Sequence, residues 1–193
     1  MILRGQTEII SAMILIGAVV AVGIAFAALA TSQVSNVVAQ GQVQQLLISE
    51  QANLFLYKEY EDSDKLCIGV LRISPSSIRY VIALVSGDGT QDLLAQNQEA
   101  LSIPTSKASV SPISWNTRSV YYVYQGQYYP LPMKGYITVV RVPDDIIQNY
   151  VMQQKPFLIC VDKTKFSSSP AKLLILIQVG DSLYEVGEWG IQI

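Results

Sequence analysis

The longest apolar stretch of the chain lies close to its N-terminus, and it limits what the chain can fold into. It runs from Ile9 to Ala30, 22 residues that carry no charge and have Ser11 as their one polar side chain. As a helix it would be about 33 Å long, enough to cross a bilayer core of about 30 Å. Because every face is apolar, lipid or other apolar surfaces would have to surround such a helix.

A short polar motif precedes this stretch. Arg4 is followed by Gly5, Gln6, Thr7 and Glu8. Secretory signal peptides carry a shorter apolar run and are cut after it, whereas the candidate processing site here lies before the run. A basic residue ahead of the run also favours a cytoplasmic N-terminus.

This sequence of features resembles the class III signal peptide of type IV pilins, most closely the archaeal ones. The features are, in order, a basic residue, a glycine, a polar residue, an acidic residue and a long apolar run. The resemblance implies that a class III signal peptidase cuts between Gly5 and Gln6, and that the apolar segment starts the mature protein. It also implies a secretion ATPase and a membrane platform protein as partners. Bacterial pilins place the acidic residue five positions after the cut, whereas Glu8 would be third. An ordinary N-terminal membrane anchor is the alternative.

Five residues are candidates for assembly. Gly17, Ala21 and Ala25 recur at every fourth position, a spacing of small residues that lets helices approach closely, although an Ala-rich segment can produce it by chance. Glu8 would be a costly carboxylate in an apolar filament core unless it is paired. Cleavage would free the backbone amine of Gln6, and this amine is the cation that the mature segment itself could offer to Glu8.

The segment after Ala30 is polar but uncharged, since no Asp, Glu, Lys or Arg occurs between Glu8 and Glu50. No proline occurs before Pro75. We therefore expect one helix from Gln6 to about Tyr57, 52 residues and about 78 Å long. This length suits a filament subunit better than a simple anchor, and a solvated stalk would normally carry charges.

The charged segment 58–65 is interpreted as a solvated linker, and short apolar runs with turn residues between them follow it. β-branched and aromatic residues dominate these runs, which predicts an antiparallel sandwich or barrel. The expected strands are Leu66–Ile73, Ile78–Ser86, Arg118–Tyr124, Gln127–Leu131, Tyr136–Val142, Phe157–Val161, Leu173–Val179 and Leu183–Trp189. The expected fold class is α+β, a long N-terminal apolar helix followed by an all-β, immunoglobulin-like head. Residues 1–5 would be the leader, 6–57 the filament-core helix and 58–193 the head.

Two features of the expected head leave alternatives open. Cys67 and Cys160 are too far apart for a metal or redox CxxC motif, and they form either one disulfide or two buried free thiols. The segment 121–136 is rich in tyrosine. It could be an adhesive face or a subunit interface, or a hairpin with aromatic pairs across its strands.

The composition argues against several functions. The chain has no histidine, the commonest general base and metal ligand, and it has no recognised catalytic or phosphate-binding motif. We expect no enzyme activity, no cofactor and no bound metal. The net charge is −2 without a basic patch, so we expect no nucleic-acid partner.

The sequence thus predicts a pilin subunit that polymerises with copies of itself into an extracellular, adhesive, type IV pilus-like filament. Before assembly it would be a single-pass protein of the cytoplasmic membrane, and afterwards part of the cell surface. Two alternatives stay open: an archaellin of a swimming filament, and a solitary membrane-anchored extracellular binding domain.

Overall fold

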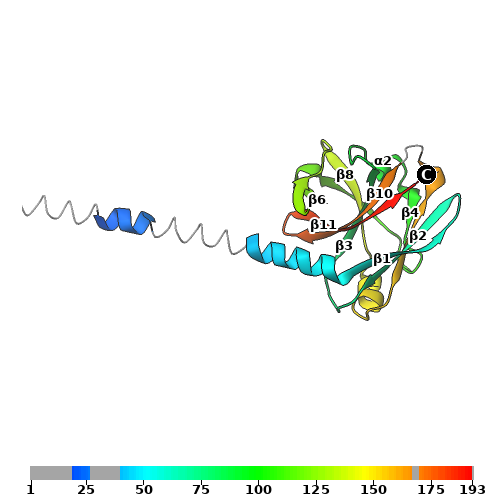
Figure 1. Cartoon of the computed structure of the whole chain (residues 1–193), viewed down its shortest axis with the longest axis horizontal. Helices are drawn as coiled ribbons and strands as arrows, with labels where there is room; N and C mark the ends of the chain where they lie inside the picture. Colours follow the sequence, from blue (N-terminus) through cyan, green and yellow to red (C-terminus); the bar gives the residue numbers. More distant parts are fainter. Residues whose placement is uncertain (1–18, 27–39, 167–169, 193) are drawn as a thin grey trace, which may run out of the picture. The chain divides into compact units, whose positions relative to one another are not determined.

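The computed structural model describes residues 19–26, 40–166 and 170–192, and β-strands dominate this part of the chain (Figure 1). The described strands form a four-stranded sheet of order β1-β2-β9-β4 and a seven-stranded sheet of order β5-β8-β3-β10-β11-β6-β7. This β-rich fold is compatible with the expected β-sandwich. The strands are β1 (Leu54–Glu61), β2 (Lys65–Arg72), β3 (Tyr80–Ser86), β4 (Leu101–Ser102), β5 (Pro112–Asn116), β6 (Val120–Tyr124), β7 (Gln127–Pro130), β8 (Tyr136–Arg141), β9 (Phe157–Asp162), β10 (Ala171–Val179) and β11 (Ser182–Ile191).

The expected fold class is wrong in its N-terminal part. The structure contains helical residues 19–26 and 40–53 and short helices within the β-rich region, but its described residues include no long apolar N-terminal helix. The short helices are α2 (Leu93–Gln96), η1 (Gln98–Ala100), η2 (Thr117–Ser119), α3 (Asp144–Ile146), η3 (Ile147–Val151) and η4 (Lys163–Lys165).

The expected localisation needs a correction as well. In segments 19–26, 40–166 and 170–192, no helix has both the length and the apolar character needed to cross a membrane. The expectation of a single-pass membrane protein is therefore not supported.

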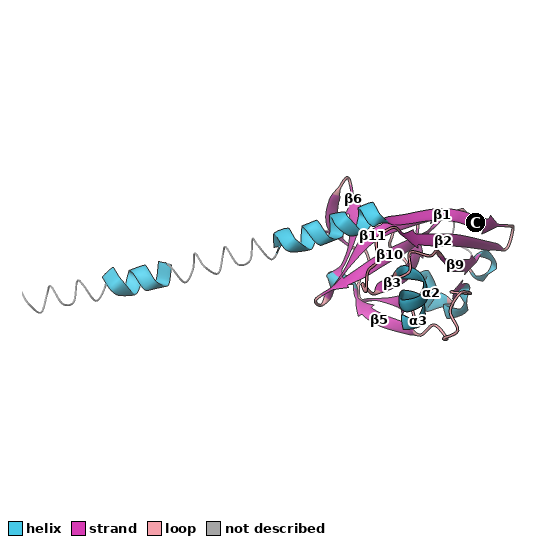
Figure 2. Ribbon diagram, turned by 90° about the horizontal axis from the view of Figure 1, so that it is seen from below, coloured by secondary structure: helices cyan, strands magenta, loops and turns pink. Residues whose placement is uncertain are grey.

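The helix expected to reach Tyr57 ends at residue 53, where β1 begins (Figure 2). The first residues of β1 alternate in exposure, and its inner leucines, Leu54 and Leu56, lie over Gly187 of β11. A Cβ atom at position 187 would meet the Leu56 side chain at 3.1 Å, so this glycine makes room for β1. Pairing with β2 along the strand, interrupted by a register shift between Lys58 and Tyr60, outweighs the local preference for helix.

The segment 58–65, interpreted above as a linker, is also part of the fold. It forms the end of β1, the turn and the start of β2, and Glu61 pairs with Leu66 in the register of the two strands. The turn is closed by Asp62, which accepts hydrogen bonds from the backbone N–H groups of Asp64 and Lys65 at 2.9 and 2.6 Å.

The eight strands expected from the sequence are all present, with small changes at their ends. Strands β1, β4 and β5 were not expected. All seven residues of β3 are buried, so both faces of that strand are covered. On one face, side chains such as Val81, Ala83, Leu174 and Leu176 form an apolar core with neighbours from β6, β8 and β11.

The chain divides into two compact units, Met1–Gln45 and Leu46–Ile193. We call the second unit the head. The last helical turns, residues 46–53, therefore belong to the head, and Leu47 and Glu50 are buried in it.

Candidate assembly interface

The expected assembly and processing residues lie mostly outside the described part of the chain. This holds for Gly5, Gln6, Glu8 and Gly17. Ala21 and Ala25 lie in the helical segment 19–26, and both are exposed.

The helical segment 19–26 displays large apolar side chains without cover from the described residues. Their exposed fractions range from 53% to 74%, for Val19, Val20, Val22, Ile24 and Phe26. An exposed apolar surface of this kind marks an interaction site, because its burial is strongly favourable. Burial of these side chains against an apolar partner would therefore be favourable.

A buried ion pair holds residues 46–53 in the head. The carboxylate of Glu50, only 2% exposed, accepts hydrogen bonds from Arg72 Nη2 at 2.5 Å and Arg72 Nε at 3.1 Å. The Tyr80 hydroxyl donates to the same carboxylate at 2.8 Å. Arg72 ends β2 and Tyr80 begins β3, so one helical side chain links both sheets.

The buried contact with Glu50 raises the pKa values of both of its partners, Tyr80 and Arg72. Burial, together with the nearby Glu50 carboxylate, raises the pKa of Tyr80, so that its hydroxyl stays a donor. Its hydrogen bond with Glu50 raises the pKa of Arg72. A buried carboxylate is tolerated only with such partners, and the position of Glu50 is therefore tightly specified.

A second link runs from the same helical turn to β7 and β11. Gln51 Nε2 donates to the Tyr128 hydroxyl at 3.1 Å, and that hydroxyl donates to the backbone oxygen of Glu185 at 3.1 Å. The Glu185 side chain is 4% exposed and accepts one hydrogen bond, from the Val123 N–H at 3.1 Å. Burial raises the pKa of Glu185 to about 7 and that of Tyr128 to about 12.

The tyrosine-rich segment forms the β6–β7 hairpin, as one of the two interpretations predicted. Gln125 and Gly126 both have positive φ angles, 51° and 76°, which is the backbone of a type I′ turn. Tyr122 pairs with Tyr129 across the strands, and their ring centroids lie 6.3 Å apart. We call residues 119–133 the tyrosine hairpin.

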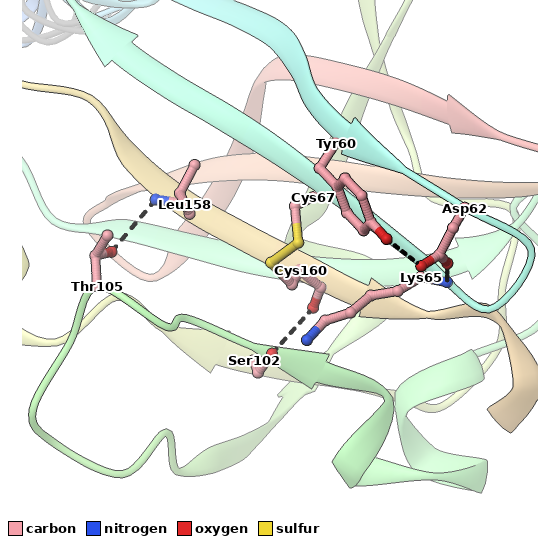
Figure 3. Close-up of a disulfide and its surroundings, with 8 residues drawn as sticks. All are labelled: Tyr60, Asp62, Lys65, Cys67, Ser102, Thr105, Leu158 and Cys160. Atoms are coloured by element: carbon pink, nitrogen blue, oxygen red, sulfur yellow. Dashed lines mark hydrogen bonds between the residues drawn. A yellow bond between two sulfur atoms is a disulfide. The ribbon is translucent and has the colours of Figure 1, made fainter.

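The two cysteines form a disulfide, which is the first of the two alternatives left open by the sequence (Figure 3). Cys67 on β2 lies directly opposite Cys160 on β9 in the antiparallel register. Ser102 of β4 donates to the Cys160 backbone oxygen at 3.5 Å, on the other side of β9. Disulfides of this kind persist in oxidising environments.

The sequence did not identify the roles of Glu50 and Glu185. Glu50 was noted only as the charged residue that ends a long uncharged stretch, and that isolation was the available signal for a buried, paired role. Glu185 gave no signal, because its burial depends on a parallel contact between β11 and β6. Across segments 19–26, 40–166 and 170–192, no three His, Cys, Asp or Glu side chains come together in a way that could hold a metal ion.

Comparisons with protein-family models, with curated proteins and with solved structures find no match.

Proposed function

We propose that this chain is a pilin-like structural subunit that polymerises with copies of itself through its uncharged N-terminal segment. The observation that carries the proposal is the exposed apolar surface of residues 19–26, within a stretch that has no charge between Glu8 and Glu50. Copies of the same segment are a matching apolar partner, and their packing would remove this surface from water.

Two features of the head support the proposal. The disulfide is typical of chains that mature in an oxidising environment. The Glu50 ion pair fixes residues 46–53 to the sheets, so that force applied to the N-terminal segment would pass into the head. The resemblance to pilins adds a class III signal peptidase, a secretion ATPase and a platform protein as proposed partners.

The test is a charge placed in the proposed core. Ala21→Lys in the full chain should abolish filaments, because an unpaired ammonium in an apolar core costs several kcal/mol per subunit. Gln98→Lys, on the exposed η1 turn of the head, is the matched control and should assemble as the wild type does. Assembly is measured by sedimentation and negative-stain electron microscopy. Normal filaments of Ala21→Lys, or no filaments of the wild type, would reject the proposal.

A further inference from the structure

A small pocket lies where the tyrosine hairpin meets β3, β10 and β11. Its volume is about 40 Å³, which gives room for about three water molecules or one small head group. Val85, Leu131 and Leu174 line it with buried apolar side chains. We call it the Glu185 pocket, because Glu185 is the buried polar side chain among the residues that line it.

One carboxylate oxygen of Glu185 is left without a hydrogen-bond donor. Oε2 accepts from the Val123 N–H at 3.1 Å, whereas Oε1 accepts no hydrogen bond from the described residues. Oε1 is nevertheless not one of their fully enclosed polar atoms, so it contacts solvent through the pocket that Glu185 lines. The side chain as a whole is 4% exposed. A carboxylate so deeply buried favours a ligand that donates a hydrogen bond to its free oxygen.

The charges around the pocket favour a cationic ligand. Glu185, Glu188 and Asp88 line it with three carboxyl groups, and Lys172 lines it with an ammonium. The Lys172 ammonium donates to Glu188 Oε2 at 3.2 Å and makes no ion pair with Glu185. With all three carboxyl groups ionised, the pocket has an excess of negative charge that its own lysine does not neutralise.

The chemistry of Glu185 suits an ammonium group better than a metal ion. Calcium and magnesium take six or more oxygen ligands, whereas Glu185 offers one free oxygen here. A primary ammonium has three N–H donors, and one hydrogen bond to a carboxylate is already charge-assisted and strong. The apolar walls formed by Val85, Leu131 and Leu174 suit the carbon chain that carries such a group.

We infer that the Glu185 pocket binds the terminal ammonium of an aliphatic amine, which donates a hydrogen bond to Glu185 Oε1. A lysine side chain of another protein and a free small amine both present this group. The inference does not rest on the proposed filament, because every residue that lines the pocket belongs to the head.

Titration with n-butylammonium chloride tests the site in the monomeric full chain in mild detergent. The NMR resonance of the Val123 amide is the readout, because this N–H donates to Glu185. We expect a saturable shift with butylammonium and none with tetramethylammonium at the same concentration, since the latter has the same charge but no N–H donor. No shift with butylammonium, an equal shift with tetramethylammonium, or tighter binding of calcium would overturn the inference.

A variant shows whether the carboxylate is the binding group. Glu185→Gln keeps an acceptor for the Val123 N–H but loses the charge, so butylammonium should bind at least about tenfold more weakly. Glu59→Gln, at an exposed position on β1, is the control and should bind as the wild type does. Circular dichroism establishes that each variant is folded. Unchanged binding to folded Glu185→Gln would overturn the inference.

The wild type provides a test that needs no substitution. Burial raises the pKa of Glu185 to about 7, and the carboxyl must lose its proton before it pairs with an ammonium. The affinity for butylammonium should therefore rise about tenfold between pH 6 and pH 8. Asp88 stays ionised, since its hydrogen bond with Ser86 lowers its pKa to about 2. The other titratable groups that line the pocket are Tyr122, Lys172 and Glu188. An affinity that is constant over this range would contradict the inference.

A lysine peptide distinguishes the two sources of the ammonium. The peptide acetyl-Gly-Lys-Gly-amide carries the same terminal group as butylammonium on a protein backbone. If it produces the Val123 shift as well, the pocket accepts a lysine side chain of a partner protein. If butylammonium alone produces it, the ligand is a free amine. Both results support the site, and a shift with neither rejects it.

Discussion

At the scale of single residues, Glu50 contributes the most specific contact between the helical turn and the sheets. Glu50→Gln would leave the Arg72 guanidinium buried without its counter-charge, because the pair is almost completely enclosed. We expect a loss of about 3–5 kcal/mol in the free energy of unfolding, measured by urea denaturation of the full chain.

A surface ion pair provides the control for this variant. Arg79 and Asp144 lie 3.6 Å apart with both side chains largely exposed. Arg79→Gln should therefore change stability by less than about 1 kcal/mol. If Glu50→Gln lowers the free energy of unfolding no more than Arg79→Gln does, the buried pair does not fix the helical turn to the sheets.

Because the carboxyl of Glu185 is buried and its pKa is raised, we expect an unusual dependence of stability on pH. Its pKa in the fold is about 7, raised by burial from 4.5, so the folded head holds this proton after the unfolded chain has released it. The stability contributed by the neutral carboxyl is fully present below pH 4.5 and is lost as the pH rises through 7. Unfolding free energy should fall by about 3 kcal/mol across this interval. The chain has no histidine to titrate in the same range.

Urea denaturation between pH 5 and pH 8 measures how the free energy of unfolding changes with pH. Glu185→Gln keeps an acceptor for the Val123 N–H but cannot ionise, so its stability should be nearly independent of pH there. Glu59→Gln, at an exposed position on β1, should keep the wild-type dependence on pH. A wild type with constant stability over this range would contradict the prediction.

At the scale of elements, the disulfide joins β2 to β9 across 93 residues of chain. Closing a loop of this length lowers the entropy of the unfolded state and contributes about 4–5 kcal/mol. Cys67→Ser with Cys160→Ser should lose most of this amount, measured as a shift of the denaturation midpoint. Reducing agent should destabilise the wild type similarly and leave the double variant unchanged, and a wild type insensitive to reductant would refute the prediction.

At the scale of the whole molecule, we expect filament assembly to depend on the side-chain carboxylate of Glu8. Glu8 and Gln6 lie outside the described residues, and their pairing remains a prediction from the sequence. If the Glu8 carboxylate neutralises a Gln6 amine in an assembled core, Glu8→Ala should markedly reduce filament yield because it leaves that amine unpaired.

Filament sedimentation together with intact mass provides the measurement. The mass of wild-type protein from its natural source should correspond to a chain that begins at Gln6. A Glu8→Ala chain that is cleaved and still assembles normally would show that the carboxylate has no role in assembly.

The sequence by itself determined the features that depend on local pattern. Alternating and continuous apolar runs located eight strands, since a strand's burial repeats with a simple period. The break between the expected strands Arg118–Tyr124 and Gln127–Leu131 marked the tip of the tyrosine hairpin, where the backbones of Gln125 and Gly126 have positive φ angles. The absence of charge between Glu8 and Glu50 likewise belongs to the sequence alone and motivates the filament proposal.

Only the tertiary structure decided where the N-terminal helix ends and which polar groups are buried. Residues 54–57 are compatible with a helix when considered locally, but pairing with β2 and packing over Gly187 make them a strand. Glu50 meets Arg72 and Tyr80 across 22 and 30 residues of sequence, and Cys67 meets Cys160 across 93. Such contacts depend on which strands lie next to each other in the two sheets, and no local sequence pattern contains that spatial order.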